Sequence, residues 1–250
     1  MPYGLYLSAA GANAQSHRLE VLSHNLANVN TTAFKPHLAM LRSRASEAIE
    51  QGIAEPGTGS VDDLSGGIQI EPSLTQFKLG PIRQTGNPTD FALQDPNQFF
   101  AILRGDRQLL TRAGNFQIDA AGSLVTPHGD PVLGAGGVPI RIDPNQPYKV
   151  SDDGAIEQAG VRQVLAVVRP RALGDLTRVG DNLFESLTSV SEVPADQRRL
   201  RSHALEASAV NPTEAMMELI EASRVYEANI RMIQTQDEAI GQLLGRVLRQ

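Results

Sequence analysis

The residues that could do chemistry in this 250-residue chain are few and scattered. None of its histidines forms the closely spaced pair with a carboxylate that a metal-binding helix would show. They are His17, His24, His37, His128 and His203. The chain has no cysteine, so it offers neither thiolate ligands nor a disulfide framework. The sequence therefore predicts no metal site, and stability must come from packing and assembly.

Two further stretches imitate functional motifs. Asp152 and Asp153 could resemble a pair of catalytic acids, but adjacent acids before a glycine in a polar loop are typical of a turn. Residues 134–137, Gly-Ala-Gly-Gly, neither lead from a strand into a helix nor precede a ribose-binding acid, and we interpret them as a flexible turn. The chain also lacks a Gly-x-Ser-x-Gly elbow and a phosphate-binding glycine loop. We therefore expect no catalytic residue, cofactor or small-molecule substrate, and no enzyme activity.

Composition and charge restrict the classes of protein to which the chain can belong. The apolar fraction of 41% is enough for a packed core in one large domain or two small ones. The formal net charge of -6, without a long basic run, disfavours a nucleic-acid partner. No apolar stretch reaches the roughly 18 residues needed to cross a bilayer. The first twenty residues lack the pattern of a cleaved secretory signal, so we expect a cytoplasmic protein or export with an intact N-terminus.

A helix with a heptad seam is predicted near the C-terminus. Asn211 can cap it, Pro212 suits its first position, and Glu214 stands where a capping-box acid reaches back. The seam then advances in alternating steps of three and four, and eight of its ten positions are apolar. These positions are Met216, Leu219, Ser223, Tyr226, Ile230, Ile233, Asp237, Ile240, Leu244 and Val247.

A weaker helix is predicted at the N-terminus. Its apolar positions recur every seven residues, with two more on the same face: Leu5, Ala12, Leu19 and Leu26, joined by Leu22 and Val29. Ser8 and Gln15 interrupt this face, and Gly11 costs a helix about 1 kcal/mol relative to Ala. Both terminal helices can be ordinary amphipathic helices packed on a central domain. Alternatively, they form a seam with each other and with neighbouring subunits.

The N-terminal helix leads into a polar turn, "SHNLANVNTTAFKP" at residues 23–36, with one large aromatic residue set into it. Four polar side chains are expected to satisfy the last helical carbonyls and redirect the chain: Asn25, Asn28, Asn30 and Thr31. Phe34, beside Lys35, then anchors the outgoing segment, and Pro36 prevents the helix from resuming.

The middle of the chain changes to short β-prone runs separated by turn residues. Residues 99–134 are interpreted as an antiparallel β meander, and further strands are expected at 138–142, 161–170 and 182–185. Residues 43–67 are rich in Glu, Gly and Ser and are interpreted as an irregular or mobile connector. The predicted fold is α+β, with a discontinuous α-helical coiled-coil domain from the two terminal helices and a β-rich central domain. The predicted boundaries are 1–35 for the N-terminal helix, 36–80 for an extended connector, 81–200 for the β-rich domain and 201–250 for the C-terminal helix.

Three ordered motifs resemble the bacterial flagellar basal-body rod protein family, the proximal and distal (FlgF- and FlgG-like) rod proteins, which are related to the hook protein. The first is "LEVLSHNLANVNTTAFKP" at 19–36. The second comprises "TGNPTDFAL" at 85–93 and "LTRAGNFQIDAAGSLVTPHGDPVLG" at 110–134. The third is "ALEASAVNPTEAMMELIEASRVYEANIRMIQTQDEAI" at 204–240.

The chain departs from the family pattern at several positions. His24 replaces the first residue of an Asn-Asn pair, Ala209 replaces an Asn, and "DPNQFF" at 95–100 lacks the usual Gly-x-Gly. Ala33 stands where Gly usually precedes the Phe. A turn that needs glycine at Ala33 is disfavoured, because Ala tolerates a positive φ poorly.

The resemblance implies a structural subunit whose terminal helices assemble helically into the hollow drive shaft that transmits motor torque to the hook and filament. It implies copies of the chain, other rod and hook proteins, and the flagellar type III export apparatus as partners. It also implies a location in the periplasm-spanning rod and export without a cleaved signal peptide. The expected assembly residues are Leu19, Leu22, Leu26, Val29, Met216, Leu219, Tyr226, Ile230, Ile233, Ile240 and Leu244.

Two alternatives stay open at this point. The run "IEASRVYEANIRMIQTQDE" favours the proximal over the distal type of rod protein by resemblance alone. The alternative from another class is a soluble β-domain binding module that a terminal coiled coil oligomerises. Growth of open-ended rods, as against discrete oligomers, separates the rod subunit from this module.

Overall fold

A computed structural model describes residues 3–53, 55, 57, 66–151 and 153–247. The chain divides into two compact units, each built from separated stretches of sequence. The first, called here the helical unit, comprises Met1–Ala27, His37–Gln76 and Asn211–Gln250. The second, called here the β-rich unit, comprises Asn28–Pro36 and Phe77–Val210.

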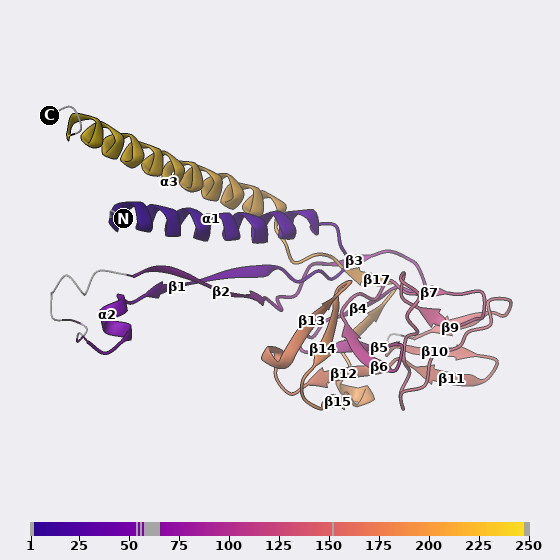
Figure 1. The fold of residues 1–250 in the computed structure, drawn as a ribbon. Coiled ribbons are helices and arrows are strands. Elements are labelled where there is room, and N and C mark those ends of the chain that lie inside the picture. The colour runs from indigo at the N-terminus through magenta and orange to yellow at the C-terminus, as the bar shows by residue number, and fades with distance from the viewer. Residues whose placement is uncertain (1–2, 54, 56, 58–65, 152, 248–250) are drawn as a thin grey trace. The chain divides into compact units, whose positions relative to one another are not determined.

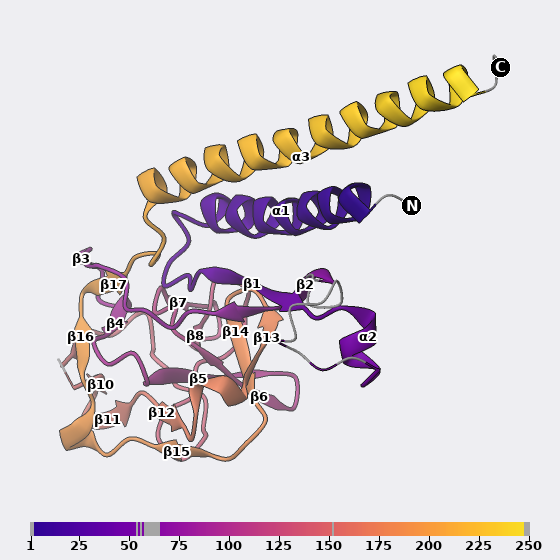
Figure 2. The same ribbon diagram turned by 90° about the vertical axis from the view of Figure 1, so that its left-hand side faces the viewer.

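The helical unit has three layers (Figures 1 and 2). Helix α1 (Tyr3–Ala27) lies between helix α3 (Pro212–Val247) and a two-stranded ribbon. Strands β1 (His37–Arg44) and β2 (Gly67–Thr75) form this ribbon, and the short helix α2 (Glu47–Glu50) follows β1. The two long helices predicted from the termini are therefore present, and the α+β class is confirmed.

The ribbon occupies much of the stretch from 36 to 80, for which the sequence indicated no strand. β1 and β2 pair antiparallel, and the register shifts between Leu38 and Met40. The sequence signal is weak because the residues that join the strands are rich in Glu, Gly and Ser, and because α1 supplies the packing surface. Part of the irregular connector expected at 43–67 falls on residues 54, 56 and 58–65, which lie outside the described residues.

The β-rich unit is built around a six-stranded antiparallel sheet in the order β13-β14-β6-β5-β12-β15. A three-stranded sheet, β11-β10-β9, and three strand pairs, β16-β4, β17-β3 and β7-β8, complete it. The strands of the six-stranded sheet are β5 (Phe99–Arg104), β6 (Arg107–Thr111), β12 (Val167–Pro170), β13 (Leu176–Gly180), β14 (Leu183–Ser186) and β15 (Val190–Glu192). The other strands are β3 (Ile82–Gln84), β4 (Phe91–Leu93), β7 (Gln117–Ile118), β8 (Leu124–Val125), β9 (Tyr148–Val150), β10 (Ala155–Gln158), β11 (Val161–Val164), β16 (Leu200–Ser202) and β17 (Ala204–Glu206). Two single 3-10 turns are η2 (Leu173–Asp175) and η3 (Ala195–Gln197).

Both faces of the central sheet are buried, which explains the unbroken apolar run at its centre. Successive side chains of a strand point to opposite faces. Phe100 and Ile102 accordingly pack in one core cluster, and Phe99 and Ala101 pack in the other. An unbroken apolar run is what a strand covered on both faces requires.

The predicted meander is correct for some of its neighbouring pairs and wrong at the step from β6 to β7. β5 pairs with β6 and β7 pairs with β8 as expected, and Val125 is bridged to Pro131 in the run that follows β8. The other neighbour of β6, however, is β14, some seventy residues later. The expected strand at 138–142 makes only isolated bridges, and the expected strand at 161–170 is divided into β11 and β12. Local sequence pattern reports strand propensity but not pairing between distant strands, so it favoured the simplest neighbouring order.

Candidate assembly site

The two long helices meet through small and polar side chains. Gly4 lies under Gln236, whose Nε2 is 2.9 Å from the position that a Cβ on Gly4 would take. Gly11 lies under Asn229 in the same way, with Oδ1 at 3.1 Å. Gly11 comes seven residues after Gly4 in α1, whereas Asn229 comes seven residues before Gln236 in α3. The two helices therefore run antiparallel. Gly11 therefore leaves room for the Asn229 side chain at the contact. From the sequence, this glycine was expected only to lower the stability of the helix.

This contact uses a different column of α3 from the one that the heptad pattern favoured. Ala215 and Ala222 are buried and stand two heptads and one heptad before Asn229. Four residues of the predicted seam are half-buried next to this column: Leu219, Tyr226, Ile233 and Ile240. The alternate column of the seam is exposed at its two ends, where Met216 and Leu244 are 51% and 57% exposed, and Ile230 between them is half-buried.

The predicted N-terminal seam is more enclosed than the C-terminal one. Leu22 is buried, and Leu19 and Leu26 are half-buried. Val29 is also half-buried, but it follows the end of α1 at Ala27 and belongs to the β-rich unit. In α1 the contact with two neighbours, α3 and the ribbon, accounts for this greater burial.

Exposed apolar side chains are concentrated on the helical unit. Among the described residues, fifteen of the nineteen exposed large apolar side chains belong to it. They are Tyr3, Tyr6, Leu7, Leu38, Leu41, Ile53, Ile68, Leu74, Met216, Met217, Ile220, Val225, Met232, Leu243 and Leu244. The helical unit therefore exposes more large apolar side chains than the β-rich unit does.

Asn25 of the family-motif turn joins the end of α1 to the start of β1. Its Nδ2 donates to the carbonyl oxygen of His37 at 2.7 Å, and the His37 N–H donates to its Oδ1 at 2.8 Å. The expectation that Asn25 satisfies the last helical carbonyls is therefore corrected, because both the N–H and the oxygen of its side-chain amide bond to His37. Thr31 closes the following turn, since its N–H and its hydroxyl donate to the carbonyl and the Oδ1 of Asn28, each at 3.1 Å.

The segment that follows is held inside the β-rich unit by backbone hydrogen bonds. The N–H of Ala33 donates to the carbonyl of Glu206 at 2.8 Å, and the N–H of Ala209 donates to the carbonyl of Phe34 at 3.1 Å. Ala33 has a φ of 53°, so it adopts the left-handed conformation that glycine favours. This conformation costs Ala about 1 kcal/mol or more, which the burial of its methyl group partly offsets.

Phe34 is buried under an arginine. Its side chain is 3% exposed, and the guanidinium of Arg178 lies 4.8 Å from the centre of its ring. The same guanidinium lies 5.6 Å from the ring of Phe184, which belongs to β14. Burial lowers the pKa of Arg178, and the two aromatic faces stabilise its charge by cation–π attraction.

Lys35, the next residue, enters a fully buried cluster of charges. Its Nζ donates to Oε1 of Glu206 at 2.5 Å and to the carbonyl of Lys78 at 2.6 Å. Arg112 donates to the other carboxylate oxygen of Glu206 from Nε at 3.0 Å and from Nη2 at 2.7 Å. The side chains of Lys35, Arg112 and Glu206 have no exposed surface, and this cluster is called here the buried triad.

Backbone groups complete the hydrogen bonding of the buried triad. Arg112 also donates to three carbonyl oxygens, those of Leu93, Asp95 and Gln98. The N–H of Gly80 donates to Oε1 of Glu206 at 2.9 Å. Burial lowers the pKa of Lys35, the Glu206 carboxylate opposes this shift, and the positive charge of Arg112 adds to it. A buried charge is tolerable only when it is paired and hydrogen-bonded in this way.

Each member of the buried triad comes from a different one of the three sequence motifs. Lys35 lies in the stretch 19–36, Arg112 in 110–134, and Glu206 in 204–240. The triad thus gives a physical reason for the three motifs to occur together, because each contributes one charge to a single buried site. Sequence reasoning selected Lys35 and missed the other two. The available signal was a charged residue close to the end of a short apolar run: Arg112 follows Leu110 after one threonine, and Glu206 follows Ala204 and Leu205.

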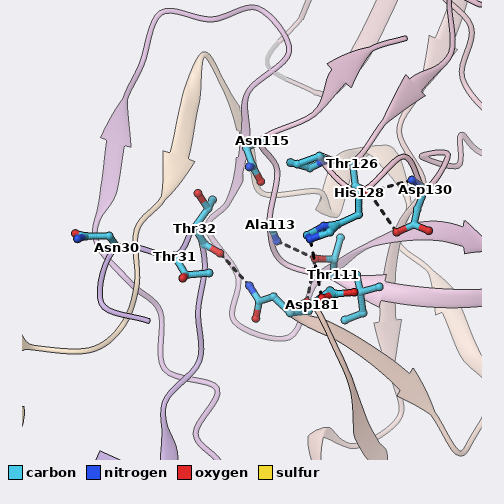
Figure 3. A pocket seen from close by; sticks show the side chains of 13 residues that line it. Asn30, Thr31, Thr32, Thr111, Ala113, Asn115, Thr126, His128, Asp130 and Asp181 are labelled. Atoms are coloured by element: carbon cyan, nitrogen blue, oxygen red, sulfur yellow. Dashed lines mark hydrogen bonds and ion pairs between the residues drawn. The ribbon is translucent and has the colours of Figure 1, made fainter. Parts of the chain in front are cut away.

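A pocket of about 300 Å³ lies beside the motif turn within the β-rich unit (Figure 3). Asn30, which is exposed, contributes to its wall with Thr31 and Thr32. The opposite wall consists of Thr111, Ala113, Asn115, Thr126, Pro127, His128, Asp130, Asp181, Asn182 and Leu183.

The pocket lining is engaged in structural contacts. Arg104 binds both carboxylates, with Nη2 at 2.6 Å from Asp130 and Nη1 at 3.0 Å from Asp181. His128 Nε2 stands 4.0 Å from Asp181 and is exposed, so it makes no hydrogen bond with that carboxylate. Asn182 donates to the carbonyl of Thr32 at 2.9 Å, which ties the motif turn to the β13–β14 hairpin. These contacts show that residues of the pocket lining support the turn.

Potential metal ligands do not gather in the described parts of the chain. No group of three or more His, Cys, Asp or Glu side chains in those parts is arranged to hold a metal ion. Neither α1 nor α3, as far as each is described, is long and apolar enough to cross a membrane.

The fold and the site define a structural protein that has a helical unit with exposed apolar faces and a β-rich unit clamped by a buried triad. Family models match three parts of the chain. They are "Flagella basal body rod protein" over residues 5–35, "Flagellar hook protein FlgE/F/G D1 domain" over 95–158, and "Flagellar basal body rod FlgEFG protein C-terminal" over 201–246.

Curated relatives match over nearly the whole chain. The flagellar basal-body rod protein FlgF of Caulobacter vibrioides is 31% identical over 235 positions, which cover 93% of each chain. The rod protein FlgG of Bacillus subtilis is 31% identical over 258 positions, which cover 96% of this chain and 97% of that protein. FlgF of Mesorhizobium japonicum is 30% identical over 252 positions, which cover 96% and 97%.

The chain belongs to the flagellar basal-body rod protein family. It is a structural protein of the basal-body rod and not an enzyme. Relatives named FlgF and FlgG match the chain at the same sequence identity, 31%, so sequence identity does not distinguish the proximal from the distal type.

Proposed function

We propose that many copies of this chain assemble helically through their terminal helices into the hollow shaft that transmits motor torque to the hook and filament. The observation that carries the proposal is the concentration of exposed apolar side chains on the helical unit. A head-to-tail contact that does not close generates a filament, and buried apolar area holds such a contact together. The partners are copies of the chain and other axial proteins of the rod and hook.

Within this proposal, the terminal helices form a coiled-coil inner domain and the β-rich unit forms the outer domain. The helices at 1–35 and 201–250 supply the inner domain, and 81–200 supplies the outer one. The ribbon at residues 37–76 belongs with the inner domain because it packs on α1. The seam residues of α3 that stay at the surface, such as Met216 and Leu244, are then available to neighbouring subunits.

The proposal includes export through the flagellar type III apparatus without cleavage of a signal peptide. Its support is the resemblance, together with the match of the N-terminal family model to residues 5–35, which include most of α1. N-terminal sequencing of the subunit from isolated basal bodies tests this route, and we expect Met1 or Pro2 at the start. A mature N-terminus cleaved well inside the first thirty or so residues would exclude it.

Replacing Ile230 by Asp tests the assembly role. An unpaired carboxylate in a buried contact costs several kcal/mol, and the cost recurs in every subunit of the rod. We expect the Ile230→Asp protein to be soluble, with an unchanged melting transition of the β-rich unit, but absent from isolated rods. Cells that depend on it should lack hooks and filaments.

The matched control is Arg231→Ala, which removes one partner of an exposed ion pair with Glu227 at 3.5 Å. Such a pair contributes little, so this variant should support swimming. Normal swimming of Ile230→Asp cells, or unfolding of the β-rich unit, would show that α3 is not an assembly surface. Discrete oligomers of the purified protein, with no open-ended rods, would favour the binding-module alternative.

A further inference from the structure

The last segment of the β-rich unit joins parts of the unit that lie far earlier in the sequence. Strand β16 pairs with β4, and β17 pairs with β3 (Figure 2). Neither β3 nor β4 has another strand partner among the described elements. The carbonyl of Arg199 accepts from the N–H of Gln94 at 2.7 Å, and the N–H of Ala207 donates to the carbonyl of Pro81 at 2.9 Å. Residues 199–209 are called here the closing segment.

The closing segment also holds the first segment of the same unit. The N–H of Ala33 donates to the carbonyl of Glu206, and Lys35 bonds to the carboxylate of the same residue within the buried triad. The stretch 28–36 begins the β-rich unit, whereas the closing segment ends just before the unit does at Val210. The two ends of the unit in sequence therefore meet in its interior, and the unit is incomplete until its last residues are in place.

Every second side chain of the closing segment is buried. This alternation is typical of a strand that has one face against a core. Leu200 belongs to the core cluster that also contains Phe91 and Leu93 of β4. A chain without the segment would therefore expose part of this core together with the edges of β3 and β4. The buried positions are Leu200, Ser202, Ala204, Glu206 and Ser208.

Charge connects the closing segment to the centre of the six-stranded sheet. Glu206 is the only acidic member of the buried triad, so a chain without this segment must bury Lys35 and Arg112 with no carboxylate between them. Arg112 directly follows the central strand β6, and its guanidinium carbon lies 5.7 Å from the centre of the Phe99 ring in β5. Burial of uncompensated charges is strongly unfavourable. The central strands therefore cannot pack around Arg112 until Glu206 is present.

We infer that the closing segment controls the folding of the β-rich unit, which stays unfolded until residues 199–209 are present and then closes around Glu206. Before that point, β3 and β4 lack a partner strand and two cations lack a counter-charge. In a chain that is exported N-terminus first, this unit stays unfolded until almost all of it has passed. That consequence rests on the proposed function, whereas the control of folding is a property of the β-rich unit alone.

Cutting the full-length chain on either side of the closing segment tests this inference. One version carries a protease recognition sequence after Asp196, in the exposed turn η3, and the other carries it between Val210 and Asn211, where the unit ends. Each purified protein is cut, its pieces are separated in urea, and the N-terminal piece is returned to buffer. We expect the piece that ends at 210 to protect the amides of β5 and β6 from hydrogen exchange. The piece that ends at 196 should lose roughly 100-fold or more of this protection.

Returning the C-terminal piece to the shorter N-terminal piece provides a second measurement. The added piece should restore the protection of β5 and β6, because it carries the closing segment. With Glu206→Gln in the added piece, restoration should require roughly 100-fold more of it, since the buried cations stay uncompensated. Arg201→Gln is the matched control, because Arg201 lies in β16 of the same segment but is exposed. This control piece should restore protection as the wild-type piece does.

Three results would overturn the inference. They are equal protection in the two N-terminal pieces, no protection in the piece that ends at 210, and equal restoration by the Glu206→Gln and Arg201→Gln pieces. The proposed function fails separately, when the wild-type chain is absent from isolated basal bodies, because the cut pieces are studied without rods.

Discussion

Replacing Glu206 by Gln removes the only acidic member of the buried triad while keeping its size. The carboxylate accepts hydrogen bonds from Lys35, from Arg112 and from the N–H of Gly80, and none of the three charged side chains is exposed. In the variant, two buried cations lose their counter-charge, and the new amide nitrogen would face a donor of Arg112 or Lys35. The β-rich unit should therefore lose much of its stability.

The size of the effect follows from this burial. Removing one partner of a buried ion pair costs about 3 to 5 kcal/mol, because the remaining charge is left uncompensated. The amide oxygen can still accept from Lys35 and Gly80, so we expect a loss of about 3 to 4 kcal/mol. With a urea slope of roughly 2 to 3 kcal/mol/M, the unfolding midpoint should fall by about 1 to 2 M.

The assay is urea unfolding of the full chain, followed by hydrogen exchange of peptides from β5 and β6. These strands report the β-rich unit without a contribution from α1 and α3. The matched control is Glu185→Gln in the same unit. Glu185 lies 3.6 Å from Arg107 in an exposed pair, so its replacement should cost less than about 1 kcal/mol.

A midpoint for Glu206→Gln equal to that of Glu185→Gln would refute the role assigned to the buried triad. The double variant with Lys35→Met provides a second check. Lys35 and Glu206 are direct partners, so the double variant should lose less stability than the sum of the two single losses. Simple additivity would show that the two side chains do not act as one cluster.

Three further outcomes follow from the β-rich unit. Gly114→Ala should prevent this unit from folding, because a Cβ at this position would overlap the carbonyl oxygen of Phe91; loss of strand signal in circular dichroism would show it. Phe34→Ala should cost about 3 to 5 kcal/mol in urea unfolding, because it empties a buried aromatic site. Arg104 holds the pKa of Asp130 below its ordinary 3.8, so this pair stabilises the fold above that pH and its contribution is lost as the pH falls through the lowered pKa. Arg104→Gln should remove this part of the acid sensitivity, measured as the pH dependence of the unfolding free energy.

The spacing of apolar residues predicted those helices and strands whose burial follows from the local sequence pattern. The capping residues and heptads gave α3 from Pro212 onward, and the apolar run at 99–103 gave β5, because local pattern and tertiary burial agree there. The pairing of β6 with β14 was not predictable, because the two strands are about seventy residues apart. The ribbon was missed because it depends on packing against α1.

The candidate site was predictable in part for the same reason. The heptad pattern identified α3 as a contact helix, but it could not show that Asn229 and Gln236, opposite two glycines, would lie at the contact with α1. Large apolar side chains dominate a periodicity analysis, whereas close approach of two helices depends on small residues. Arg112 and Glu206 were missed because a buried charge cannot be distinguished from an exposed one until its partner is known.

Labelling this chain in isolated basal bodies tests directly whether it is a subunit of the basal-body rod. An epitope inserted at Gly136 and Gly137, in an exposed turn of the β-rich unit, can be detected with gold-conjugated antibody by electron microscopy. We expect gold particles along the rod, with none on basal bodies from cells that carry the untagged chain. Tagged protein that supports swimming but leaves the rod unlabelled, and is recovered only as soluble oligomers, would contradict it.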